Sequence, residues 1–284
     1  MQKIQKHDTF ALLLSEFNLL QMIMKKRGIL FFCCILFVVF AFSRPLPVVL
    51  RAEGIKTIVI DAGHGGKDPG ALGFGYKEKD ITLKIALALK KMINEKLPKI
   101  KVILTRETDK FIELSKRGEI AQNNEADFFI SIHCNSVPKG VSSPQGGTFY
   151  ILGTNKGQER YDAYIRENEV VVFEENYKEM YGGFDPKSSE GAIFHTVMKN
   201  VFRSESLNLA GKINAEYLKL QRKTFGVKQA PFIVLWQSGV PAILVETGYI
   251  SHATEAKYLA SAAGQAEIAQ AIFNAISSYV GEVQ

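Results

Sequence analysis

The chain has 284 residues, of which 46% are hydrophobic and 23% are charged, a balance typical of a folded domain rather than of a disordered chain. Its formal net charge is +6, but the lysines and arginines beyond Arg27 are interspersed with acids and are not interleaved with aromatic residues. These features argue against nucleic-acid binding and predict one main domain, which we expect to be monomeric.

An apolar stretch from Ile29 to Phe42 follows three basic residues, 25–27, and ends near small residues. This order predicts a secretory signal over residues 1–43. The stretch is shorter than the ~20 residues of a membrane span, and an uncleaved anchor is the alternative. Because the region before it is unusually long, we expect translation to begin at Met22 or Met24. The protein is thus expected in the periplasm or cell envelope, touching a membrane only through an uncleaved leader.

A proline-containing linker, residues 44–54, leads into the predicted domain of residues 55–284. A strand over Lys56–Ile60 opens into a glycine-rich loop, after which Asp80 is expected to cap a helix that runs to about Leu97. The next predicted elements are a strand at Lys101–Thr105, a helix at Leu114–Asn123, and strands at Ala126–His133 and Thr148–Leu152.

The composition changes between about residues 154 and 206, where tyrosines and glutamates are frequent. We interpret this segment as a helical insertion. The predicted elements after it are a helix at Leu207–Leu220, strands at Ala230–Trp236 and Pro241–Val245, and a helix at Ala263–Val280. Alternation of strands and helices predicts an α/β fold, with a mostly parallel twisted sheet flanked by helices on both faces.

Three apolar strand-like runs end on residues that bind a metal or act beside one: His64, His133 and Glu246. The carboxyl ends of parallel strands meet at one edge of a sheet, where functional sites lie. Zinc hydrolases hold their metal with three nitrogen or carboxylate ligands and keep a fourth position for water. Glu78 is a candidate third ligand, and Asp61 and Asp68 compete for that role. The pattern therefore predicts a site for one Zn²⁺.

Several of these residues have another interpretation. Asp61 can orient His64 instead, and Asp68, which precedes a proline, suits a turn. Cys134, the only cysteine outside the leader, is expected to be a small buried residue rather than a ligand. His195 and His252 are expected at the surface.

Glu246 ends an almost wholly apolar strand, so burial should raise the pKa of its carboxyl group. A buried acid of this kind suits a general base, although a salt bridge to an arginine such as Arg106 or Arg222 is the alternative. The glycine-rich loop also suggests phosphate binding, but GHGGKDPG has neither the Walker spacing nor the dinucleotide spacing.

Four motifs occur in order along the chain: IVIDAGHGGKDPGALG, KEKDITL, TRETDKFIELSKRGEIAQNNEADFFISIHCNS and VPAILVETGYIS. Together they resemble the zinc-dependent N-acetylmuramoyl-L-alanine amidases of the amidase-3 type. The resemblance implies a cell-wall hydrolase that cleaves the amide between the lactyl group of N-acetylmuramic acid and L-alanine of peptidoglycan. It further implies that His64, Glu78 and His133 bind zinc and that Glu246 is catalytic. Asn135 and Arg106 are candidates for substrate contact.

Similar enzymes of the division-septum type carry a helical segment at the position of the 154–206 insertion, and it blocks the site until an activator protein removes it. The resemblance thus implies that an acid such as Glu174 or Glu175 takes the open zinc position, although a substrate-shaping lid is the alternative. Two other functions stay open: a zinc peptidase or carboxypeptidase acting on wall peptides, and a non-catalytic peptidoglycan-binding protein.

Overall fold

A six-stranded sheet organises the computed structural model, which describes residues 54–153, 163–174 and 202–283. The strand order is β4-β1-β5-β8-β6-β7. The first four strands are parallel to one another, and β6 and β7 run in the opposite direction. The strands are β1 (Thr57–Ala62), β4 (Lys101–Leu104), β5 (Phe128–Asn135), β6 (Gly147–Leu152), β7 (Thr224–Ala230) and β8 (Ala242–Tyr249).

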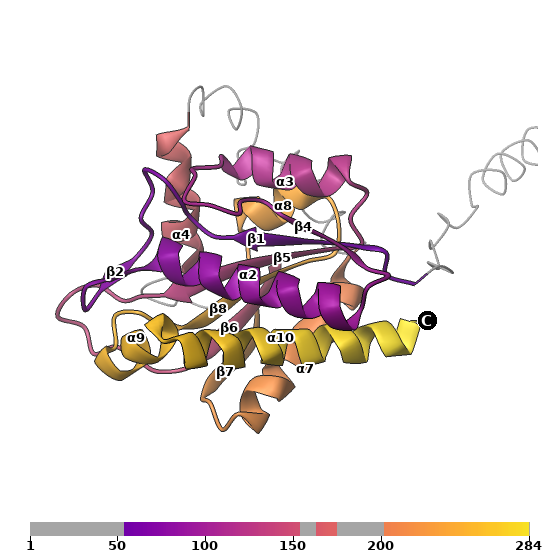
Figure 1. Ribbon diagram of the computed structural model, residues 1–284. Coiled ribbons are helices and arrows are strands. Elements are labelled where there is room, and N and C mark those ends of the chain that lie inside the picture. The colour runs from indigo at the N-terminus through magenta and orange to yellow at the C-terminus, as the bar shows by residue number, and fades with distance from the viewer. Residues whose placement is uncertain (1–53, 154–162, 175–201, 284) are drawn as a thin grey trace, which may run out of the picture. The chain divides into compact units, whose positions relative to one another are not determined.

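Helices cover both faces of this sheet, as Figure 1 shows. One face carries α2 (Glu78–Lys96), α7 (Arg203–Lys219) and α10 (Ala262–Val283), and the other carries α3 (Leu114–Asn123) and α8 (Ile233–Ser238). The smaller elements are the hairpin of β2 (Leu72–Gly73) and β3 (Tyr76–Lys77), then α4 (Ala163–Asn168), the 3₁₀ helix η1 (Glu169–Phe173) and α9 (Ala253–Ala260). The predicted α/β fold with a mostly parallel sheet is confirmed.

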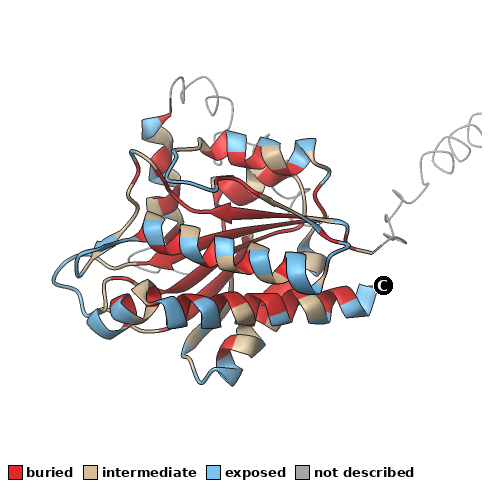
Figure 2. Cartoon of the chain, viewed as in Figure 1, coloured by how far each residue is buried: buried red, intermediate tan, exposed pale blue. Residues whose placement is uncertain are grey.

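Successive residues of the central strands pack into different cores. In β1, Ile58 and Ile60 join the core under α2 and α10, whereas Val59 joins the core under α3 and α8. Because side chains alternate between the two faces of a sheet, a strand covered on both sides must be apolar throughout. Figure 2 shows the result, a buried sheet between helices that are exposed only on their outer sides.

Two expectations about elements are corrected, and one helix is new. Helix α2 begins at Glu78 rather than after Asp80. The predicted strand Ala230–Trp236 contains only the last residue of β7, and its second half, from Ile233, lies in helix α8. Helix α9 was not predicted at all.

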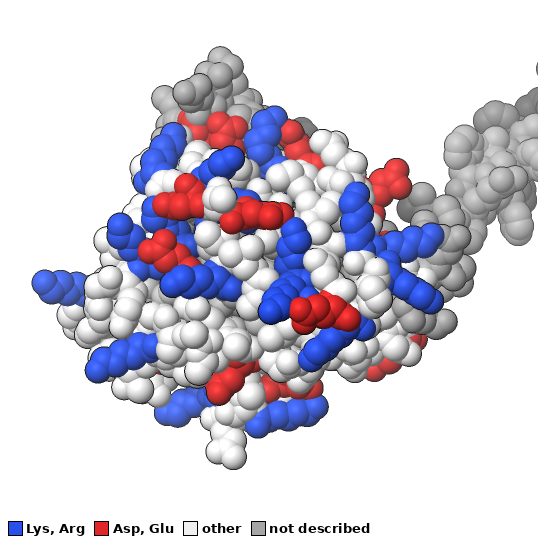
Figure 3. Space-filling view, in the orientation of Figure 1, with Lys and Arg blue, Asp and Glu red and all other residues white. Residues whose placement is uncertain are grey.

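Residues 1–53, with the predicted leader, the start sites Met22 and Met24 and nearly all of the linker, lie outside the described residues, as do Glu175 and His195. Within the described part, no helix combines the length and the apolar character needed to cross a membrane. Basic and acidic side chains are interspersed over the face in Figure 3, as the sequence led us to expect.

Candidate metal centre

Four buried side chains from four segments converge beside the carboxyl ends of β1 and β5. His64 follows β1, Glu78 opens α2, His133 lies in β5 and Glu167 lies in α4. One ligand atom from each lies within 4.8 Å of all the others. The three predicted ligands are therefore brought together, and a fourth group from the insertion joins them.

The distances within the cluster suit a shared ion. Glu78 Oε1 lies 3.2 Å from His64 Nε2 and 3.1 Å from His133 Nδ1, and Glu167 Oε2 lies 3.0 and 2.9 Å from the same two nitrogens. Ligand atoms placed tetrahedrally at about 2.0–2.1 Å from zinc lie roughly 3.3 Å apart. Among the described residues, buried His64 Nε2 and Glu167 Oε2 make no hydrogen bond of good geometry, although they lie only 3.0 Å apart. Two imidazoles and two carboxylates thus fit a divalent metal such as zinc.

Neighbouring groups orient the ligands. Asp68 Oδ2 accepts a hydrogen bond from His64 Nδ1 at 2.7 Å, which leaves Nε2 facing the cluster. Glu78 Oε2 accepts from the backbone N–H of Ala71 at 2.8 Å, and its Oε1 accepts from that of Cys134 at 2.7 Å. The carboxylate of Glu78 is therefore fixed by the loop before it and by β5.

Before a metal binds, the charges within the cluster favour the carboxylate forms of the acids and the protonated forms of the histidines, and each histidine must release its proton to act as a ligand. Burial alone would lower the pKa of His133, but the carboxylates of Glu167 and Glu78 outweigh it and raise this pKa to about 9. Burial alone would raise the pKa of Glu78, but chiefly the imidazolium of His64 lowers it to about 2. The acids are thus present as carboxylates, the form that binds a metal.

Glu246 lies in β8, directly opposite His133 in the strand register, and is completely buried. Burial raises the pKa of its carboxyl group to about 8, with nearby Glu167 and Glu78 adding to the shift and Arg166 opposing it. The raised pKa was predicted. The arginine beside Glu246 is Arg166 of α4, with Nη2 at 3.4 Å from Oε1, and neither Arg106 nor Arg222.

The other sequence candidates have different surroundings. Arg106 is buried and bonds to backbone carbonyls, so its predicted contact with substrate does not fit this structure. Asn135 is buried at the end of β5, and its Oδ1 accepts from Arg166 Nη1 at 3.4 Å. Asp61 does not orient His64; it bonds Thr105, Ser131 and Arg117, and Asp68 takes the orienting role.

Glu174, predicted to reach the metal, instead accepts a hydrogen bond from the backbone N–H of Leu114 at 2.6 Å. Cys134 is buried, as expected, and its Sγ lies 3.4 Å from Thr247 Oγ1. His252 is the N-cap residue of α9 and accepts from the N–H of Glu255.

Glu167 is the member of the cluster that the sequence did not reveal. The insertion contains many acids, and no spacing or motif sets this one apart from Glu174. The neighbouring Arg166 is no signal by itself, since Glu159 and Arg160 form the same kind of pair within the insertion. Nη2 of Arg166 lies 2.7 Å from Glu167 Oε1.

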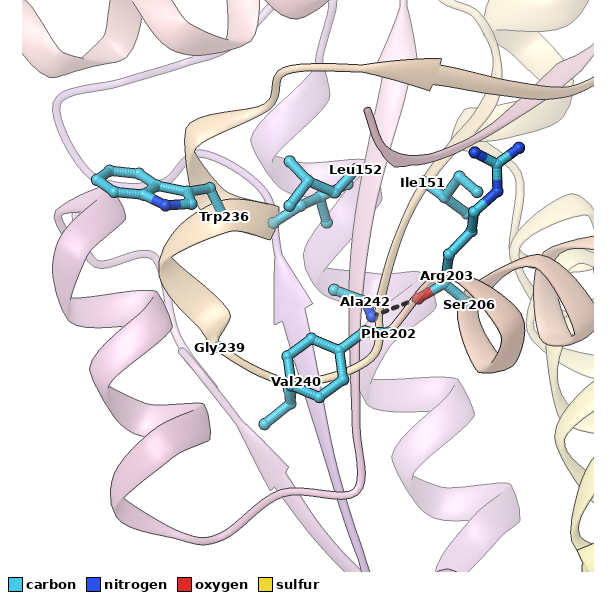
Figure 4. A pocket seen from close by; sticks show the side chains of 10 residues that line it. Ile151, Leu152, Phe202, Arg203, Ser206, Trp236, Gly239, Val240 and Ala242 are labelled. Atoms are coloured by element: carbon cyan, nitrogen blue, oxygen red, sulfur yellow. Dashed lines mark hydrogen bonds between the residues drawn. The ribbon is translucent and has the colours of Figure 1, made fainter. Parts of the chain in front are cut away.

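A separate pocket lies between the start of α7, α8 and the start of β8 (Figure 4). Ser206 Oγ accepts there from the backbone N–H of Ala242 at 3.0 Å, beside Phe202 and Trp236. None of the metal-centre residues lines this pocket, so it carries no part of the chemistry.

Comparisons with known proteins agree with this geometry. The family model described as N-acetylmuramoyl-L-alanine amidase matches residues 58–278. The chain is 35% identical over 251 residues to N-acetylmuramoyl-L-alanine amidase AmiC of Escherichia coli O6:H1, covering 84% of this chain but 56% of that protein. It is 32% identical over 232 residues to a relative named putative N-acetylmuramoyl-L-alanine amidase from Buchnera aphidicola of Acyrthosiphon pisum, covering 78% and 94%.

Among solved structures, the CwlD amidase from Clostridioides difficile, in complex with the GerS lipoprotein, matches with a TM-score of 0.57 at 27% identity and covers 80% of this chain and 99% of that one. The sequence match spans the strands and helices that carry His64, Glu78, His133 and Glu246. This chain belongs to the N-acetylmuramoyl-L-alanine amidase family.

Proposed function

We propose that this protein hydrolyses peptidoglycan at the amide bond between the lactyl group of N-acetylmuramic acid and the L-alanine of the stem peptide. The observation that carries the proposal is the buried cluster of His64, Glu78 and His133 beside Glu246, in a chain of this amidase family. The chain spans about half the length of AmiC, so the activity of that whole protein is carried over only as a proposal.

His64, Glu78 and His133 would hold one Zn²⁺, which when bound activates a water molecule and polarises the scissile carbonyl. Glu246 acts as general base: it takes a proton from the attacking water and delivers it to the alanine nitrogen as the C–N bond breaks. A base is most effective when its pKa lies near the working pH, and burial raises the pKa of Glu246 to about 8. Asn135, at the end of β5, stays a candidate for substrate contact.

Mass spectrometry of muropeptides after digestion of purified peptidoglycan tests this function. An amidase releases intact stem peptides and leaves glycan without peptide. A zinc carboxypeptidase would instead release single amino acids, and a non-catalytic binding protein would release nothing. A metal chelator should abolish release and added zinc should restore it.

We further propose that the 154–206 insertion keeps the site closed until a partner protein removes it. Glu167 takes the fourth position of the cluster, where a water ligand would bind, and Arg166 lies against Glu246. A related structure, CwlD, was solved in complex with a lipoprotein, which makes a protein partner for this chain reasonable. Deletion of residues 154–206 tests this: higher basal activity is expected, whereas unchanged activity would support a substrate-shaping lid.

Export of the protein is also part of the proposal. The apolar stretch Ile29–Phe42 after three basic residues supports a secretory leader, with peptidoglycan reached in the periplasm or cell envelope. N-terminal sequencing of precursor and mature protein would locate the start, expected at Met22 or Met24, and the cleavage site, expected near Ser43. A precursor that begins at Met1 would contradict the expected start.

A further inference from the structure

Two buried arginines lie beneath the metal centre, and neither is one of its ligands. The exposed fraction is 3% for Arg106 and 1% for Arg117. Burying a guanidinium group is costly unless its N–H groups find acceptors. The acceptors used here include the backbone carbonyls of Ala62, Gly63 and His64, which belong to the segment that leads from β1 to His64.

Arg106 connects this segment to the helix that carries Glu78. Its Nε donates to the carbonyl of Ala62, and its Nη2 donates to the carbonyls of Gly63 and Lys79, each at 2.8 Å. The same Nη2 lies 3.2 Å from Thr82 Oγ1, which itself donates to the Gly63 carbonyl at 2.9 Å. Lys79 and Thr82 belong to the first turns of α2, directly after Glu78.

Arg117 connects the same segment to the strand that carries His133. Its Nη1 donates to the carbonyl of Ala62 at 2.9 Å and its Nη2 to that of His64 at 3.0 Å. Nη1 also forms a buried salt bridge with Asp61 Oδ1 at 2.8 Å. Asp61 Oδ2 in turn accepts from the hydroxyl of Ser131 at 2.7 Å, and Ser131 lies in β5 two residues before His133.

The segment between β1 and His64 needs such support because its backbone is unusual. His64 has a φ of 59°, in the left-handed region that residues other than glycine rarely adopt. Gly63 passes so close to the other ligand that a Cβ there would lie 2.5 Å from the ring of His133. A small shift of this backbone would therefore change the positions of both imidazoles.

We propose that Arg106 and Arg117 are positioning residues, which together hold the carbonyls of residues 62, 63 and 64 and so fix the three ligand-bearing segments relative to one another. This inference rests on the proposed metal site. A guanidinium group suits the task because its planar fork binds several carbonyls at once, which a lysine ammonium group cannot do in the same geometry. Replacing either arginine by lysine keeps the charge and removes the fork.

Zinc affinity of the full chain, measured by competition with a chromophoric chelator, tests the proposal without any need for activity. In Arg106→Lys, the dissociation constant for zinc should rise about 10- to 100-fold, the usual effect of losing a group that orients a ligand. The absorption spectrum of the Co²⁺-loaded variant should also change, because that spectrum reports the arrangement of the ligands. Arg117→Lys should behave in the same way.

Arg222→Lys is the matched control, because Arg222 is also largely buried, pairs with Glu255 at 2.8 Å and makes no hydrogen bond to the described segment of residues 62–64. It should lower the melting temperature and leave zinc affinity unchanged. If neither arginine variant folds, Thr82→Val, which removes one hydroxyl from the same network, should weaken zinc binding to a smaller extent.

A folded Arg106→Lys or Thr82→Val protein with the zinc affinity and cobalt spectrum of the unaltered chain would overturn the positioning role. That result would leave the proposed function standing. An unaltered chain that binds no zinc would instead overturn the metal site itself.

Discussion

Glu246 has an exposed fraction of zero, and its Oε2 makes no hydrogen bond within the part of the chain that the structure describes. An acid in this position can accept and return a proton, whereas an amide of the same shape cannot. We therefore expect Glu246→Gln to lower the rate of muropeptide release by about 10²–10⁴-fold, the usual contribution of a general base. Zinc affinity should not change, since Glu246 is not a ligand; a variant that keeps most of its activity would contradict the role.

The buried carboxylate of Asp61 should make the free energy of unfolding depend on pH. Burial alone would raise its pKa, but Arg117 first, and then the hydroxyls of Thr105 and Ser131, lower it below 3.8. A lowered pKa means that the charged form stabilises the fold above the unfolded-state value and that this contribution is lost as the pH falls through the folded-state value. Asp61→Asn should thus lose about 3–5 kcal/mol near neutral pH, because Arg117 is left unpaired.

Urea unfolding of the zinc-free chain and of this variant, followed from about pH 7 to about pH 3, measures the effect. The difference in free energy of unfolding should shrink only at the acid end, below the ordinary pKa of 3.8. Asp68→Asn, which alters a ligand partner rather than the Arg117 pair, is the comparison. A difference that stays constant over the whole range would show that the charge of Asp61 does not stabilise the fold.

At the scale of elements, the sequence predicted the strands that carry the site better than the helices around them. The apolar runs ending at His133 and Glu246 lie in β5 and β8, as predicted, and they are apolar because strands covered on both faces are apolar throughout. Helix α2 begins two residues earlier than its expected cap at Asp80, since Glu78 donates its N–H to the carbonyl of Ala71 and its carboxylate accepts from the N–H of Ala71. A contact with a preceding loop replaced the capping side chain, and no local pattern reveals such a contact.

Helix α8 shows a second limit. Its apolar residues Ile233–Trp236 match a buried strand as well as a short buried helix, and periodicity cannot separate the two over so few residues. These residues form a helix because they pack against α3, which covers the same face of the sheet. Glu167 was missed for a related reason, because its role depends on where the insertion folds back rather than on its neighbours in the sequence.

Helix α4 places Glu167 in the metal cluster, so a substitution there should change basal activity. Glu167→Ala should raise basal muropeptide release without any partner, because it frees the fourth position of the cluster for water. Glu174→Ala is the matched control: Glu174 is a buried acid of the same segment that bonds Leu114 and not the cluster, so basal activity should stay low. Equal activities for both variants and the unaltered chain would contradict a blocking role for Glu167.

For the molecule as a whole, the metal centre joins segments from residue 64 to residue 167 that meet only in the folded chain. Metal binding should therefore stabilise the native state by mass action, by about 4 kcal/mol at a free zinc concentration ~1,000 times the dissociation constant. For a domain of this size that amounts to a rise of roughly 8–16 °C in melting temperature. Calorimetry with zinc and with a chelator measures the shift.

Two variants identify the source of this stabilisation. Glu246→Gln should keep the full zinc-dependent shift, because it removes the base and no ligand. His64→Ala should lose most of this shift in melting temperature, because the substitution removes a proposed ligand. Asp68 orients the imidazole of His64, and its buried Nε2 makes no hydrogen bond in the described part of the chain. A melting temperature that does not respond to zinc in the unaltered chain would mean that the four converging side chains stabilise the fold by their mutual charges alone.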